Sequence, residues 1–154
     1  MALPQEVQQT FLALVNSGNI VYTVYPTAAT PLVDVTGIAL TADAAGSKLG
    51  GTVEIIAGAG GIATAFWVCG IMVNTASAAD QFLVRLASGA GDGVAFADFG
   101  PMDLTAVTAN IPPIHLPHPV RFAALTRIAG RVACLDAVAR TLNVSVLVAT
   151  GIGT

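Results

Sequence analysis

The chain has 154 residues, of which 55% are hydrophobic and 10% charged, and its formal net charge is −3. This length suits one domain with its own core, and the acidic balance argues against a nucleic-acid-binding protein, which normally carries a basic patch. Because so few charges leave much neutral surface, we expect association with copies of itself or with a larger partner.

The first segment of the chain is the only one with a clear helical pattern. In PQEVQQTFLALV, residues 4–15, Val7, Phe11, Leu12 and Val15 fall on one side at helical spacing. The sequence therefore predicts a short helix or arm over residues 1–17, followed by one domain over residues 18–154. The apolar run near the N-terminus is too short for a signal-peptide core and follows no basic segment, which favours the cytoplasm as the place of synthesis.

From residue 19 onward, short apolar segments alternate with clusters of Gly, Asp, Asn, Ser or Pro, a pattern typical of all-β proteins. We expect strands within the segments 19–27, 33–40, 51–58, 63–73, 81–88, 93–100, 110–117, 124–134 and 141–150. Residues 103–110 are expected to form a short helical turn or a loop. The fold class predicted from this pattern is a single-domain antiparallel β-sandwich of about eight strands.

Residues 55–79 carry no charge and are long enough to imitate a membrane span. The sequence GAGG at 58–61 interrupts the run like a turn, and no Lys or Arg flanks it closely. Two strands joined at GAGG are the better interpretation, so we expect no membrane partner.

Two arginines lie four residues apart in the segment LTRIAGRVAC. With the two-residue period of a strand, Ile128 and Val132 share a core-facing side, while Arg127 and Arg131 share the outer side. The arginines could be solvated or could contact another subunit, with Asp98 and Asp103 as candidate carboxylates; these alternatives stay open.

The same alternation predicts the faces of three other strands. Phe82, Val84 and Leu86 are expected to point inward, as are Leu142, Val144, Val146 and Val148. Trp67 is expected in the core together with Cys69 and Ile71.

No catalytic, cofactor-binding or metal-binding residues emerge from the sequence. His115 and His118 lie in a proline-rich segment without further ligands nearby, so a strand edge or a turn is expected there. Cys69 and Cys134 are too few and too distant for a disulfide framework or zinc site. The Gly-rich stretches 58–63 and 88–93 lack phosphate-loop features and predict turns. We therefore expect a protein that is not an enzyme, with no cofactor and no small-molecule substrate.

The C-terminal third, IPPIHLPHPVRFAALTRIAGRVACLDAVARTLNVSVLVATGI, resembles the ending of small structural proteins of tailed-bacteriophage heads. In those proteins a proline-rich extended strand precedes a segment like the one from Thr126 to Val132, and a polar turn leads to a final alternating strand. The rhythm of the preceding strands is also similar, so the likeness covers residues 50–152. One departure is Leu125, where the pattern usually has Gly.

This resemblance implies a jelly-roll β-sandwich that decorates and stabilises a phage capsid. The implied partners are the major capsid protein and two further copies of the chain in a homotrimer, on the capsid exterior of a virion assembled in the host cytoplasm. The residues expected to contact the capsid or other subunits are Phe11, Leu12, Arg121, Arg127 and Arg131. The alternatives are another head-fibre or tail component, or a jelly-roll carbohydrate-binding module.

Overall fold

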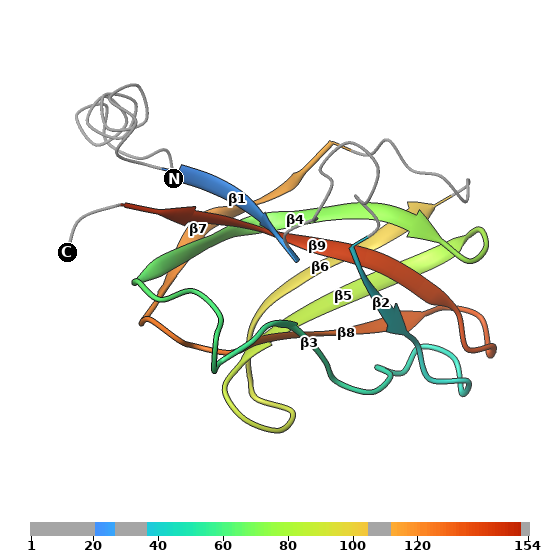
Figure 1. The fold of residues 1–154 in the computed structure, drawn as a ribbon. Helices are drawn as coiled ribbons and strands as arrows, with labels where there is room; N and C mark the ends of the chain where they lie inside the picture. Colours follow the sequence, from blue (N-terminus) through green and yellow to red (C-terminus); the bar gives the residue numbers. More distant parts are fainter. Residues whose placement is uncertain (1–20, 27–36, 105–111, 152–154) are drawn as a thin grey trace.

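The computed structural model describes residues 21–26, 37–104 and 112–151, and these residues form nine strands and no helix (Figure 1). The strands are β1 (Val21–Tyr25), β2 (Ile38–Thr41), β3 (Val53–Ile56), β4 (Phe66–Ala76), β5 (Asp80–Ser88), β6 (Val94–Leu104), β7 (Ile114–Phe122), β8 (Ile128–Cys134) and β9 (Thr141–Thr150). Each strand overlaps one of the segments expected from the sequence, and the all-β prediction is confirmed. The expected helix or arm over residues 1–17 lies outside the described residues.

The strands form two antiparallel sheets that pack face to face as a β-sandwich (Figure 1). The five-stranded sheet has the order β1-β9-β4-β7, and β2 pairs with β9 beyond the end of β1. The four-stranded sheet has the order β3-β8-β5-β6.

The antiparallel pairs are nested inside one another along the chain. The innermost pair is β5 with β6, and around it lie β4 with β7, then β3 with β8, and finally β1 and β2 with β9. The chain therefore runs like one long hairpin, whose successive pairs fall alternately into the two sheets. Both ends of this long hairpin, at β1 and β9, lie in the five-stranded sheet.

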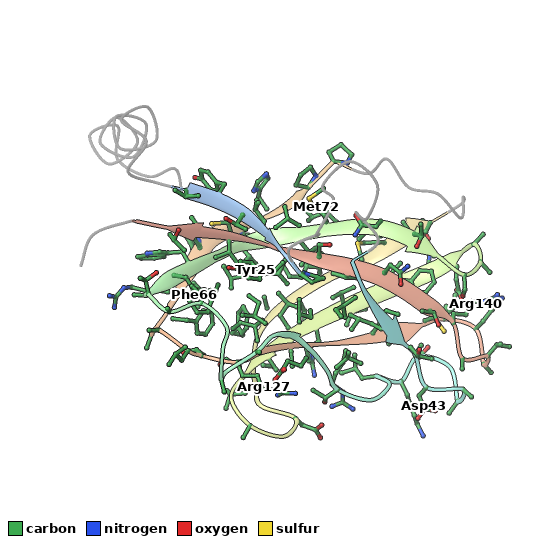
Figure 2. All side chains as sticks on the ribbon, viewed as in Figure 1. Tyr25, Asp43, Phe66, Met72, Arg127 and Arg140 are labelled. Carbon is green, nitrogen blue, oxygen red and sulfur yellow. The ribbon has the colours of Figure 1, made fainter. Side chains whose placement is uncertain are left out.

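The core lies between the sheets and is built by the alternating apolar residues of both. Phe82, Val84 and Leu86 of β5 point into it, as expected. Phe66, also labelled in Figure 2, packs against the ring of Phe122 at a centroid distance of 5.7 Å. Every second residue of β9 is fully buried in the same core, which confirms the expected inward set Leu142, Val144, Val146 and Val148.

The expectation that Trp67 lies in the core with Cys69 and Ile71 is wrong. Phe66 and Val68 are the core residues, so Trp67 is on the outer face, where it is half-buried. The register of β4 shifts between Val68 and Gly70, and this β-bulge returns Ile71 to the core.

Gly70 allows the close approach of β7 at this bulge. A Cβ atom on Gly70 would lie 2.2 Å from the carbonyl oxygen of Ile114, closer than any side chain tolerates. The inward and outward faces of β4 therefore depend on one residue without a side chain.

The uncharged stretch 55–79 contains the end of β3, a loop, β4 and the turn after it, rather than one continuous span. β3 and β4 belong to different sheets, so the loop containing GAGG crosses from one sheet to the other. Within the described ranges, no helix has the length and hydropathy needed to cross a membrane.

Candidate functional site

The outer face of the four-stranded sheet carries arginines that bind acceptors of their own chain. Arg127 donates from Nε to Glu54 at 2.8 Å, and from Nη1 to the carbonyl oxygens of Gly89 at 2.8 Å and Gly91 at 3.0 Å. Its side chain is 22% exposed. Arg127 lies beside the loop that joins β5 and β6, at the opposite end of the sandwich from Arg140 (Figure 2). It therefore ties this loop to β3 and to the start of β8.

Arg131 has a similar role at the neighbouring loop. Its Nε donates to the carbonyl oxygen of Gly50 at 2.8 Å, and Asp92 lies 4.0 Å from its guanidinium group. Arg127 and Arg131 thus share the outer face, as predicted, and hold loops in place. Their role as capsid or subunit contacts stays a prediction.

Asp98 pairs with Arg85 rather than with either of these arginines. Two parallel hydrogen bonds join the side chains, from Nε at 2.8 Å and from Nη2 at 2.7 Å. The hydrogen bonds from Arg85 hold the pKa of Asp98 below its usual range. Asp103, the other carboxylate considered from the sequence, lies opposite Gln81 and forms no ion pair with the described residues.

One nearly buried carboxylate is fully engaged in the fold. The side chain of Asp80 is 4% exposed, and it accepts hydrogen bonds from Arg140 Nε at 3.2 Å and from the backbone N–H groups of Gln81 and Asp136. These bonds hold the loop between β8 and β9 against the start of β5. A buried acid with three donors and a positive partner is a structural group, because its charge is compensated within the protein.

The outer face of the five-stranded sheet is mostly neutral. Strand register places Tyr22, Ala149, Trp67 and Arg121 side by side in one row across β1, β9, β4 and β7. Arg121 therefore lies on the sheet opposite to that of Arg127 and Arg131, so the five candidate contact residues do not form one cluster. Phe11 and Leu12 lie outside the described residues.

Next to this row, an apolar depression of about 370 Å³ opens on the same face. It is lined by Tyr22, Cys69, His115, Leu116, Pro119 and Leu147. Burial raises the pKa of the Cys69 thiol, which keeps it protonated and weakly nucleophilic. His115 is exposed on β7, an edge strand, in agreement with the expected strand edge.

A second apolar depression, of about 420 Å³, lies on the outer face of the four-stranded sheet, at the end where β5 begins. Its lining includes Leu49, Leu83, Pro101, Ala133 and Leu135, together with Gln81. Gln81 and Asp103 are paired neighbours on β5 and β6, so Asp103 lies beside one of the residues that line this depression.

No group of three or more His, Cys, Asp or Glu side chains suited to a metal ion occurs in the part of the chain that the structure describes. The Gly-rich stretch 88–93 is the hairpin loop between β5 and β6, as expected. Comparisons with protein-family models, curated proteins and solved structures find no match to this chain.

Proposed function

We propose that this protein is a non-enzymatic structural component of a virus particle, which decorates a tailed-bacteriophage capsid by binding the lattice of its major capsid protein. Three lines of reasoning support the proposal: the strand order, the turn before β8, and the contrast between the two outer faces.

The nested pairing of strands supports a jelly roll, which is a long antiparallel hairpin rolled into two sheets. For this assignment β1 and β2 count as one interrupted strand, since both pair with the same edge of β9. A jelly roll is the fold that the resemblance to phage head proteins implies. Because one fold occurs in proteins of many different functions, the fold supports the proposal but does not by itself identify the function.

The observation that carries the proposal is the backbone of Leu125. Phage head proteins of the similar pattern usually have Gly directly before the Thr-Arg pair, and Leu125 occupies that position here. Its φ is 58°, in the left-handed region that favours glycine. A backbone conformation that glycine adopts readily therefore occurs at the position where the pattern usually has Gly, which supports the proposal although the residue here is leucine.

Such a protein stabilises a shell by adding many small contacts at symmetric positions. Each contact buries a modest apolar area, and copies that are joined to one another bind with a higher effective concentration. The neutral outer face of the five-stranded sheet offers apolar and aromatic side chains for this purpose, including Trp67 and Leu147.

The direct test is co-sedimentation of the purified protein with phage capsids that lack it. We expect saturable binding at a fixed number of copies per shell, and shells that resist higher temperature when decorated. Deletion of residues 1–17 is expected to weaken attachment while the sandwich stays folded by circular dichroism. If shells neither bind the protein nor gain stability, the proposal fails. Electron micrographs that place the protein in the tail would instead favour a tail component.

A carbohydrate-binding module is the second candidate, and the outward position of Trp67 beside Ala149 and Tyr22 favours it. Aromatic rings on a sheet face can stack on sugar rings. Glycan-array binding that is lost in Trp67→Ala, without loss of folding, would support this function over capsid decoration.

A further inference from the structure

We infer that copies of this chain join head to tail, with Arg121 of one copy paired with Asp103 of the next. The inference deepens the proposed function, on which it rests, by naming the surfaces that join the copies. We define the Arg121 patch as Tyr22, Pro119, Arg121 and Leu147. The Asp103 patch is Leu49, Leu83, Asp103 and Leu135.

Arg121 and Asp103 differ from most other charged side chains because neither forms an ion pair with the described residues. Arg85, Arg127, Arg131 and Arg140 each lie within 4.0 Å of a carboxylate, whereas Arg121 has no such partner among the described residues. Asp103 likewise lacks a cation there, and both side chains belong to exposed residues. Asp43 and Lys48 also form no ion pair with the described residues, but they lie together on the loop between β2 and β3.

Each unpaired charge is next to an apolar depression. Arg121 is two residues along β7 from Pro119, which lines the depression on the five-stranded sheet. Asp103 is paired with Gln81, which lines the depression on the four-stranded sheet. An apolar centre with a charged or aromatic rim is the composition of a protein–protein contact, in which Tyr, Trp and Arg dominate the binding energy.

Two side chains at the rims provide apolar surface for such a contact. Tyr22 in the Arg121 patch is 42% exposed, and Leu135 in the Asp103 patch is 58% exposed. In the same row as Arg121, the buried Nε1 of Trp67 has no hydrogen-bond partner among the described residues. An unpaired buried donor is costly, and a partner that shifts the indole or brings an acceptor would relieve that cost.

The positions of the patches require a head-to-tail arrangement. The Arg121 patch lies where β7 and β9 end, and the Asp103 patch lies on the other sheet where β5 begins. One copy cannot bring its own two patches together, and a contact between identical patches would oppose like charges. A contact between different patches closes into a ring when the rotation between copies permits it, and a ring of three is the trimer expected for the proposed function.

Charge reversal with the full chain tests this pairing. Sedimentation equilibrium measures self-association of the wild type, Arg121→Asp, Asp103→Arg and the double variant that carries both changes. We expect a wild-type trimer, association weakened about 10- to 100-fold in each single variant, and restored association in the double variant. Asp43→Arg is the matched control, because it makes the same charge change at an exposed acid outside both patches, and it should associate like the wild type.

Disulfide trapping gives a readout that does not depend on the strength of the ion pair. A mixture of Arg121→Cys and Asp103→Cys chains should form a cross-linked dimer on mild oxidation, whereas each variant alone should form little. Cys69 and Cys134 are buried and should not compete. A monomeric wild type, unchanged single variants, a double variant that is not restored, or no mixed dimer would each overturn the inference.

The same variants separate this inference from the proposed function. A wild-type trimer that depends on the Arg121–Asp103 pair but does not bind shells would sustain the inference and refute capsid decoration. If the protein decorates shells but its self-association is unchanged by Arg121→Asp and by Asp103→Arg, the inference is refuted and the proposed function stands.

Discussion

The outer faces of the two sheets use their charged residues differently. On the four-stranded sheet, Arg85, Arg127 and Arg131 all donate to carboxylates or carbonyl oxygens of their own chain. On the five-stranded sheet, Arg121 forms no ion pair with the described residues and lies beside the neutral side chain of Trp67. The arginines of the four-stranded sheet therefore stabilise the fold, whereas Arg121 on the five-stranded sheet is available to bind a partner.

The largest effect is expected where the five-stranded face is built, at Gly70. In Gly70→Ala the new methyl group would meet the backbone of Ile114, and neither strand can move away without losing the pairing of β4 with β7. We expect a loss of about 3 kcal/mol in the free energy of unfolding, measured by urea denaturation.

Gly51→Ala is the control for this substitution, because a Cβ atom there has no neighbour within 4 Å. We expect its stability to stay within about 0.5 kcal/mol of the wild type. Equal stabilities for the two variants would show that the close approach at the bulge does not matter.

A smaller effect, which contrasts the two faces directly, is expected from Arg127→Ala and Arg121→Ala. Loss of Arg127 leaves the carboxylate of Glu54 and two loop carbonyls without their donor, so we expect a loss of about 2 kcal/mol. Arg121→Ala should change the stability of the monomer by less than about 0.5 kcal/mol, because Arg121 is exposed and lacks an ion pair in the described part of the chain.

Urea denaturation at a protein concentration below that of self-association measures both variants. If Arg121→Ala is the more destabilising of the two, the contrast between the faces is wrong.

The smallest effect is expected at the exposed pair of Arg85 and Asp98. The pKa of Asp98 is lower in the folded protein than in the unfolded chain, since Arg85 hydrogen-bonds to the carboxylate. The pair therefore stabilises the fold above the ordinary pKa of aspartate, and this contribution is lost as the pH falls through the lowered pKa.

Both side chains of this pair are more than a third exposed, so we expect Asp98→Asn to cost only about 0.5 kcal/mol at pH 7. The difference from the wild type should shrink as the pH is lowered into the acid range, as followed by urea denaturation at each pH. A difference that grows on acidification would contradict the assigned direction of the pKa shift.

Several features of the fold could be read from the sequence because they depend on neighbouring residues. The alternation in β5, β8 and β9 correctly identifies the residues of the shared core, such as Phe82, Val132 and Val144, and the outer position of Arg131. Turn residues such as those at 88–93 marked the strand ends. The alternation places Trp67 wrongly because it assumes an unbroken strand, whereas the register of β4 shifts between Val68 and Gly70, where β7 approaches closely.

The candidate surfaces were less accessible to sequence reasoning. Arg121 was a candidate contact, yet its row with Trp67 and Tyr22 joins residues separated by 45 to 99 positions along the chain. From the sequence, Asp98 and Asp103 are equivalent as partners for arginine. Strand pairing places Asp98 opposite Arg85, whereas Asp103 lies opposite Gln81 and has no cationic partner among the described residues. For the outward position of Trp67 on β4, the sequence offers one signal, which is Gly70 three positions further along.

The sequence by itself determined the strands, their turns and most of their buried faces, because side-chain direction repeats every two residues and glycine and polar clusters end strands locally. The tertiary structure alone decided which strands are neighbours, where the register shifts, and which charges find partners. These depend on contacts between distant segments, whose distances are set only when the two sheets pack.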